Sequence, residues 1–249
     1  MTNEIPDAAS SEPLTEKLAL AWTHTARFLT TASQLVHLPA TELPEIAFVG
    51  RSNAGKSTAI NTLAQQKRLA FASKTPGRTQ HINLFELGPK DAADALFADL
   101  PGYGYAAVAK SAKVRWQKVM ADYLAVRRSL SGVVLMVDSR LGLTDLDKQL
   151  LEFVEARVAT GEIKLLVLLT KSDKLNRKEA DAALRATTEF LAGMTTENSD
   201  VAVTLFSALK KSGVGDVAMV LREWVLAHQS AGEVPDDVLA AAPAEPDEG

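Results

Sequence analysis

Residues 46–60, IAFVGRSNAGKSTAI, carry the strongest structural signal in the chain. The first four residues are an apolar run typical of a buried strand, and helical sequence begins at Lys56. Between them, residues 50–57 match the phosphate-loop pattern Gly-x-x-x-x-Gly-Lys-Ser. Glycine lets backbone N–H groups approach a polyphosphate closely, and the positive end of the following helix points at the same anion. The sequence therefore predicts a nucleotide phosphate site at a strand–helix junction.

Three side chains of this loop have expected roles in binding. Lys56 would bridge the outer phosphates, and the Ser57 hydroxyl would take one position around Mg²⁺. Asn53 places a side-chain oxygen beside the phosphates, where it would hold K⁺ in place of the positive charge of an arginine finger. Stimulation of turnover by K⁺ is therefore a hypothesis, and a purely structural Asn53 is its alternative.

Short apolar runs alternate with helical stretches over the rest of the chain. Most runs are continuous, as in strands buried on both faces of a sheet. The connection between 82–87 and 95–100 is too short for a helical crossover, so this pair is predicted to be antiparallel. The sequence predicts a three-layer α/β fold with a mostly parallel six-stranded sheet and one antiparallel edge strand. The predicted strands are 46–49, 82–87, 95–100, 133–137, 165–169 and 201–206, and the predicted helices are 56–65, 108–128, 144–158, 177–192 and 214–227.

Base recognition is predicted where the run 165–169 leads into Thr170-Lys171-Ser172-Asp173. Ligands of α/β proteins bind at the carboxyl ends of strands. The Asp173 carboxylate would accept hydrogen bonds from N1–H and the exocyclic amine of guanine, whereas adenine would leave it unpaired. Lys171 would lay its methylene stem along the base. Phe206-Ser207-Ala208 follows the last predicted strand and would donate backbone N–H groups to the guanine oxygen.

A first switch segment is predicted in residues 74–81, KTPGRTQH, between the first helix and the next strand. A threonine in such a loop closes over the γ-phosphate and binds Mg²⁺, and hydrolysis releases the segment. Thr79 is the expected ligand, with Thr75 as the competing candidate.

A second switch segment begins at Asp99-Leu100-Pro101-Gly102, at the end of a predicted strand beside the phosphate loop. Asp99 suits an indirect contact to Mg²⁺ through water, and Gly102 would offer its N–H to the γ-phosphate. Tyr103 follows where Ras-like proteins carry the glutamine that orients the attacking water. No other residue is an obvious catalytic base, so slow intrinsic hydrolysis is expected.

Composition excludes several classes of function. The chain has 249 residues and no cysteine, which excludes disulfides, zinc clusters and thiol nucleophiles. No apolar run approaches the roughly 18 residues that cross a bilayer, and the acidic N-terminus does not have the pattern of a secretory signal. We therefore expect a cytoplasmic protein without a membrane partner. Residues 1–19 and 229–249 are expected to be acidic, disordered extensions around one domain at 20–228.

Five strings closely resemble the EngB-type (YihA/YsxC) bacterial GTPases: GRSNAGKS, SKTPGRTQHINLF, DLPGYGYA, TKSDKL and FSALKKSGV. The resemblance covers roughly residues 20–228 and places the chain in the TrmE-Era-EngA-EngB-Septin-like superfamily. It implies a P-loop GTPase domain with Mg²⁺ on Ser57 and Thr79. It also implies roles in large ribosomal subunit assembly and normal division septation. The nucleotide contacts that it implies are Gly50, Arg51, Ser52, Asn53, Ala54, Gly55, Lys56, Ser57, Gly77, Arg78, Thr79, Gln80, His81, Asp99, Leu100, Pro101, Gly102, Thr170, Lys171, Ser172, Asp173, Phe206, Ser207 and Ala208.

The distribution of charge is compatible with a ribosomal partner, that is rRNA with ribosomal proteins. Without its acidic ends, the stretch 17–228 has a net charge of +6. Bases on the predicted helix after the second switch would couple nucleotide state to rRNA phosphates, and the alternative is a solvated helix face. These bases are Lys110, Lys113, Arg115, Lys118, Arg127 and Arg128, opposed only by Asp122.

Two other function classes stay open at this stage. One is a GTP-dependent recruitment switch at the division site without RNA contact. The other is a small-molecule kinase, which shares the phosphate loop but requires an acceptor site and lid arginines. The chain has a guanine reader and two switch-like loops instead. Nothing in the sequence suggests an obligate dimer, so we expect a monomer.

Overall fold

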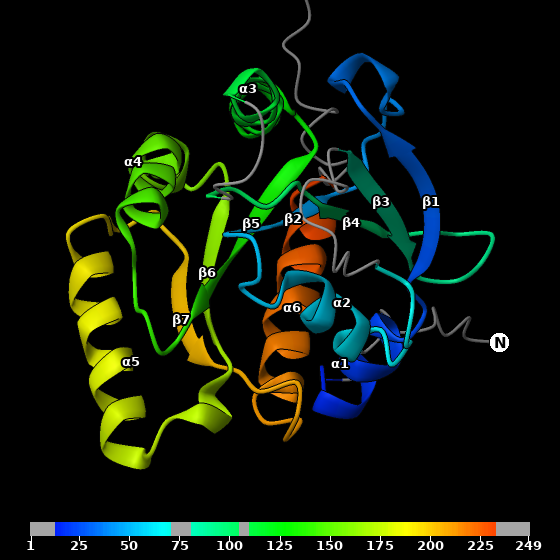
Figure 1. The fold of residues 1–249 in the computed structure, drawn as a ribbon. Coiled ribbons are helices and arrows are strands. Elements are labelled where there is room, and N and C mark those ends of the chain that lie inside the picture. Colours follow the sequence, from blue (N-terminus) through cyan, green and yellow to red (C-terminus); the bar gives the residue numbers. More distant parts are fainter. Residues whose placement is uncertain (1–12, 71–80, 105–109, 233–249) are drawn as a thin grey trace, which may run out of the picture.

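The computed structural model describes residues 13–70, 81–104 and 110–232, with the backbone alone for 110–117 and 231–232. In these ranges, one seven-stranded sheet is covered by helices on both faces (Figure 1). The strands are β1 (Arg27–Ala32), β2 (Glu45–Gly50), β3 (Ile82–Leu87), β4 (Ala95–Asp99), β5 (Leu130–Asp138), β6 (Lys164–Thr170) and β7 (Val201–Leu205). Their order across the sheet is β1-β3-β4-β2-β5-β6-β7.

The parallel strands end together at one edge of the sheet. β2 pairs in parallel with β4 and β5, and β6 lies in parallel between β5 and β7. The carboxyl ends Gly50, Asp99, Asp138 and Thr170 therefore lie at one edge. Ligands of open α/β sheets bind at this edge, outside the strand ends.

Two layers of helices cover the sheet (Figure 1). α1 (Glu16–Thr23), α2 (Lys56–Leu63) and α6 (Val214–Gly232) lie on one face, and α3 (Lys110–Val126), α4 (Asp145–Ala159) and α5 (Arg177–Ala192) lie on the other. Ile46 and Phe48 belong to the core beneath α2 and α6, whereas Ala47 and Val49 belong to the core beneath α3, α4 and α5. A strand that is fully buried on both faces reads as a continuous apolar run, as predicted for this stretch.

The predicted fold class is confirmed, and so is the antiparallel pairing of β3 with β4. The predicted number of six strands is wrong, because β1 adds a seventh and covers β3. The antiparallel strand β3 is therefore second from the edge. β1 has no apolar run of its own, and its Phe28 is 57% exposed. Backbone pairing with β3 and the ion pair of Arg27 with Glu86 hold it in place.

Helices at both ends of the described chain extend beyond the domain limits expected at residues 20 and 228. α1 begins at Glu16 after the N-cap Thr15, and its Trp22 is buried in the core beneath α6. α6 continues to Gly232. The domain boundaries remain predictions, since residues 1–12 and 233–249 lie outside the described residues. Among the helices described, none is long and apolar enough to cross a membrane.

Candidate nucleotide-binding site

The phosphate loop lies between β2 and α2, at the carboxyl edge of the sheet. β2 ends at Gly50, and Gly55 is the N-cap of α2 with a φ of +98°, a conformation that glycine adopts without strain. Asn53 is left-handed as well, with a φ of +68°. The loop thus has the strand–turn–helix setting that a phosphate cradle requires.

Lys56 lies buried in this loop and forms an ion pair with Asp99 at the end of β4. β4 is the parallel neighbour of β2, so its last residue comes level with the loop. Asp99 is fully buried, and one of its oxygens, Oδ1, accepts the hydrogen bond from Lys56 Nζ. Its other oxygen, Oδ2, has no hydrogen-bond partner in the described part of the chain. A buried carboxylate oxygen without a partner is costly and marks a position for a ligand.

The residues at this point fit Mg²⁺ held jointly with phosphate. No group of three or more His, Cys, Asp or Glu side chains that could hold a metal ion gathers among the described residues. Mg²⁺ in nucleotide sites is characteristically bound by one or two protein oxygens together with substrate phosphates. The Ser57 hydroxyl would supply one such oxygen, and Asp99 Oδ2 would accept a hydrogen bond from a metal-bound water.

The loop at Thr170–Asp173 is fastened to the phosphate loop by two side chains. Thr170 Oγ1 donates to the carbonyl oxygen of Ala54 at 2.6 Å, and Lys171 Nζ donates to that of Asn53 at 2.7 Å. Lys171 is left-handed, with a φ of +58°. The predicted phosphate and base segments are therefore one connected unit, although they lie more than a hundred residues apart.

Asp173 is oriented by the segment that follows β7. The Ser207 hydroxyl donates to Asp173 Oδ1 at 2.6 Å, and Ser172 N–H donates to the carbonyl oxygen of Phe206 at 3.2 Å. The hydrogen bond from Ser207 lowers the pKa of the Asp173 carboxyl. The side chain therefore stays an ionised acceptor, as the predicted reading of guanine requires.

The predicted switch residues fall partly outside the described residues, namely Gly77, Arg78, Thr79 and Gln80. His81 is described and exposed. In the second switch, Leu100 and Pro101 are buried, and Gly102 lies against the phosphate loop. A Cβ added at Gly102 would lie 3.2 Å from Ser52 Cα, so a side chain there would require the two segments to separate by a few tenths of an ångström. The nucleotide contacts of all predicted site residues remain predictions.

Sequence reasoning missed Asp138, at the end of β5 between the phosphate loop and the base segment. Asp138 Oδ2 accepts from Lys171 Nζ at 2.8 Å and from the Arg140 guanidinium at 2.6 Å. The hydrogen bond from Arg140, with that from Lys171, holds the pKa of Asp138 well below its usual range. An acid that ends a buried strand was the signal used for Asp99, and the run VLMVD at 134–138 carries the same signal.

A phosphate loop on a strand–helix junction, joined to a Thr-Lys-x-Asp loop at the same sheet edge, defines a P-loop GTP-binding protein. Comparison with known proteins agrees. Residues 45–171 match a protein-family profile described as 50S ribosome-binding GTPase. The chain belongs to the EngB family of GTP-binding proteins.

Curated relatives carry this assignment over most of the chain. A probable GTP-binding protein EngB of Polaromonas sp. (strain JS666 / ATCC BAA-500) is 60% identical over 88% of this chain and 86% of its own length. Its counterpart in Acidovorax ebreus (strain TPSY) is 62% identical over 82% of this chain and 90% of its own. The resemblance seen in the motifs is confirmed, and membership of this family makes the chain a GTPase.

Solved structures agree on the fold. The crystal structure of a probable GTP-binding protein engB matches 74% of this chain and 99% of its own, with a TM-score of 0.54 and 23% identity. The crystal structure of Era in complex with MgGDPNP and nucleotides 1506–1542 of 16S ribosomal RNA matches 74% of this chain and 57% of its own, with a TM-score of 0.56 and 19% identity.

Proposed function

We propose that this GTPase is a switch in assembly of the large ribosomal subunit and binds the maturing particle in its GTP form. The proposal depends on an exposed basic surface beside the two segments predicted to bind guanine, 170–173 and 206–208. The chain also matches a profile for 50S ribosome-binding GTPases. Slow hydrolysis suits such a timer, and Tyr103 in place of a water-orienting glutamine is consistent with it.

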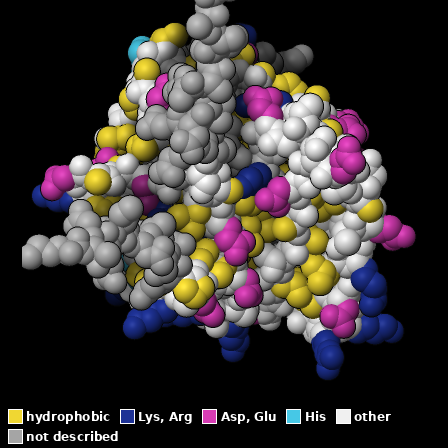
Figure 2. Space-filling view, turned by 180° about the vertical axis from the view of Figure 1, so that it is seen from behind, with side chains coloured by type: hydrophobic (Ala, Val, Ile, Leu, Met, Phe, Trp, Pro, Cys, Tyr) yellow, Lys and Arg dark blue, Asp and Glu magenta, His cyan; other side chains and the backbone are white. Residues whose placement is uncertain are grey.

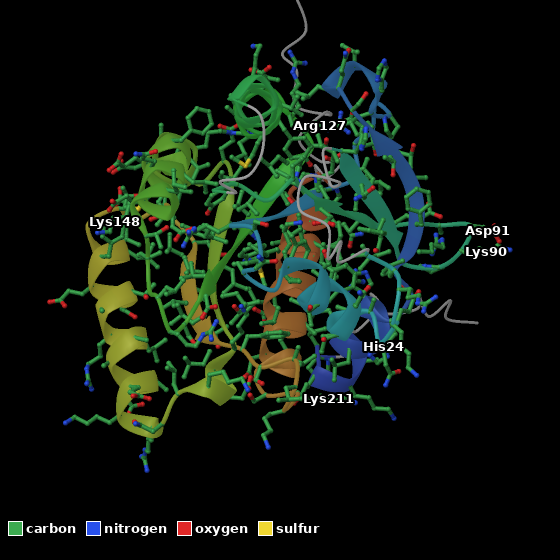
Figure 3. All side chains as sticks on the ribbon, viewed as in Figure 1. His24, Lys90, Asp91, Arg127, Lys148 and Lys211 are labelled. Carbon is green, nitrogen blue, oxygen red and sulfur yellow. The ribbon has the colours of Figure 1, made fainter. Side chains whose placement is uncertain are left out.

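The basic surface is formed by two loops and a helix start. The loops are held together by the hydrogen bonds between Ser172 and Phe206 and between Ser207 and Asp173. Figure 2 shows Lys and Arg side chains along the lower rim of the molecule, the end at which Figure 3 places Lys211. Lysine and arginine at such a surface neutralise the phosphates of RNA. Its exposed bases are Lys174, Arg177, Lys178, Lys210 and Lys211.

Not every base expected on the helix after the second switch is available to contact RNA. Arg127, labelled in Figure 3, forms an ion pair with the fully buried Glu45 and is not a free base for RNA. The reason is its position, because the chain turns from α3 into β5 there and passes the start of β2. Lys118 lies within 3.1 Å of Asp122. The side chains of Lys110, Lys113 and Arg115 lie outside the described residues.

The finer roles belong to the same proposal. GTPases of this class use Mg²⁺, and we place it between Ser57, Thr79 and the phosphates, with K⁺ beside Asn53. We further propose a cytoplasmic monomer whose loss disturbs division septation through defective ribosomes.

Co-sedimentation with ribosomal particles tests the proposal. We expect the protein to sediment with large-subunit precursors in a non-hydrolysable GTP analogue and to stay in the supernatant in GDP. Arg177→Glu/Lys178→Glu should weaken this sedimentation at least tenfold, because a phosphate contact becomes a repulsion. These residues begin α5, where an acidic side chain is compatible with the helix dipole.

The matched control is Lys17→Glu/Lys90→Glu, which changes the net charge equally at exposed positions outside the five bases of the basic surface. We expect it to sediment like the wild type. Equal loss in both variants would reduce the effect to net charge and overturn the proposed surface. A wild type that binds GTP but sediments in neither nucleotide would favour the recruitment switch at the division site.

A further inference from the structure

Tyr103 follows Gly102, and its side chain is not directed freely into solvent. The residue is 7% exposed, and its hydroxyl donates a hydrogen bond of 2.6 Å to Asp147 Oδ1. Asp147 belongs to the first turn of α4 and is itself buried. The side chain therefore joins the second switch to a helix that contributes no predicted nucleotide contact.

The backbone of Tyr103 is fastened to the phosphate loop at the same time. Ser52 N–H donates to the carbonyl oxygen of Tyr103 at 2.8 Å, and Tyr103 N–H donates to that of Gly50 at 3.3 Å. Gly102, the residue just before Tyr103, lies in close contact with Ser52. Tyr103 thus has three attachments, two on the phosphate loop through its backbone and one on α4 through its hydroxyl.

Asp147 connects the Tyr103 hydroxyl to the N-terminus of α4. Its second oxygen, Oδ2, accepts from the Thr144 N–H at 2.8 Å and from the Thr144 hydroxyl at 2.6 Å. Thr144 is the N-cap of α4, so Asp147 holds the cap with one oxygen and Tyr103 with the other. A displacement of Tyr103 must therefore either break its bond to Asp147 or move the first turn of α4. Burial raises the pKa of the Tyr103 hydroxyl further above its ordinary value.

We propose that Tyr103 is a positioning residue for GTP hydrolysis: through Asp147 it sets the place of Gly102 and transmits the presence of the γ-phosphate to the first turn of α4. The proposal rests on the assignment of Gly102 N–H to the γ-phosphate. The phenol takes no proton from water and touches no reacting atom. Its role is to hold the backbone of Gly102, which is assigned to the γ-phosphate. Its hydrogen bond to Asp147 transmits movement of the second switch to α4.

Tyr103→Phe tests the proposal, because it removes the hydroxyl and keeps the ring. We expect the affinity for a non-hydrolysable GTP analogue and the single-turnover hydrolysis rate to fall about tenfold, in keeping with one hydrogen bond to a charged group. The affinity for GDP should stay within twofold, since Gly102 is assigned to the γ-phosphate alone. Equal losses for GDP and the analogue, or no loss for either, would overturn the proposal.

Tyr123→Phe is the matched control. The Tyr123 hydroxyl also donates a hydrogen bond to a buried carboxylate, that of Glu45, but at the amino end of β2 and away from the phosphate loop. We expect this variant to lose stability without any change in the ratio of analogue to GDP affinity. Thr144→Ala is a second control, since it removes a bond to Asp147 but leaves the one from Tyr103. A change of the affinity ratio in both controls would reduce the effect to general destabilisation and overturn the proposal.

Amide hydrogen exchange supplies a readout that a merely structural role would not move. The Thr144 amide bonds to Asp147, so its protection reports the first turn of α4 directly. In the wild type, protection there should differ between GDP and the GTP analogue, and in Tyr103→Phe the difference should vanish. A wild type that binds both nucleotides yet shows equal protection overturns the coupling. Ribosome co-sedimentation, measured separately, decides the proposed function independently.

Discussion

Two buried carboxylates, Glu45 and Asp99, lie at opposite ends of the parallel strands, and their hydrogen-bond partners differ. Glu45 begins β2 and is fully buried, but both of its oxygens are hydrogen-bonded. They accept from Arg127, from the Tyr123 hydroxyl and from the Ser129 hydroxyl. This network is complete within the protein and leaves no place for a ligand.

Asp99 ends β4 at the other edge and is equally buried. It has one partner, Lys56, on one oxygen, and its second oxygen has none in the described chain. Asp173 is intermediate, because Ser207 holds one oxygen at 2.6 Å and Lys174 lies only within 3.7 Å of the other. A buried carboxylate with both oxygens hydrogen-bonded stabilises the fold, whereas an incompletely paired one marks the binding site.

The largest effect is expected for Asp173→Asn, which addresses ligand recognition without touching the core. Two hydrogen bonds from guanine to an ionised acceptor would be lost, at about 1.5–3 kcal/mol each. We expect GDP affinity to fall by roughly a hundredfold or more, with xanthine nucleotides gaining in preference because their 2-oxo group suits an amide donor. Titration calorimetry with GDP and XDP checks this. Unchanged guanine selectivity would mean that the base is read elsewhere.

Glu45→Gln should cost about 3 kcal/mol of unfolding free energy, because it leaves the Arg127 guanidinium without its charged partner. Urea unfolding measures this cost, and the folded fraction should bind GDP normally. Glu86→Gln is the control, since Glu86 pairs with Arg27 at a partly exposed position and should cost less than about 1 kcal/mol. Similar losses of unfolding free energy in the two variants would contradict the distinction between a buried ion pair and a partly exposed one.

Asp99→Asn should lower both hydrolysis and stability, because it also leaves the buried Lys56 ammonium without its charged partner, whereas Glu45→Gln should lower stability alone. Loss of a charge that orients metal-bound water lowers activity about 10–100-fold. Single-turnover hydrolysis at varied Mg²⁺ concentration measures this, with urea unfolding in parallel. If Asp99→Asn unfolds as readily as Glu45→Gln and hydrolyses GTP at the normal rate, the two carboxylates do not differ in the way proposed.

The smallest effect concerns alkaline pH and both tyrosine–carboxylate pairs. Burial raises the pKa of Tyr103 and of Tyr123 above the ordinary value of 10.0. A raised pKa in the folded state gives stability that is complete below about pH 10 and is lost as the pH rises further. Each tyrosine should contribute a loss of about 1.4 kcal/mol per pH unit above that point. Urea unfolding between pH 9 and 11 should show a shallower decline in Tyr103→Phe and in Tyr123→Phe.

The phosphate loop and the base segment were predictable because their signals are local. Gly50–Ser57 follows an apolar run and opens a helix within fifteen residues, and Thr170–Asp173 directly follows another such run. The connection between β3 and β4 is short enough to require antiparallel pairing. Strand β1 escaped prediction because its large apolar residues Phe28 and Leu29 are exposed on an outermost strand, so that no buried run marks it.

The class of fold and the two nucleotide motifs can therefore be read from the sequence, since spacing along the chain is enough to specify a strand, a turn and a helix start. Which distant side chains meet follows from the three-dimensional fold and not from any local pattern. Lys171 reaches Asp138 over 33 residues, Tyr103 reaches Asp147 over 44, and Arg127 reaches Glu45 over 82. Such pairs depend on strand order and on helices crossing the sheet, and no local pattern encodes either.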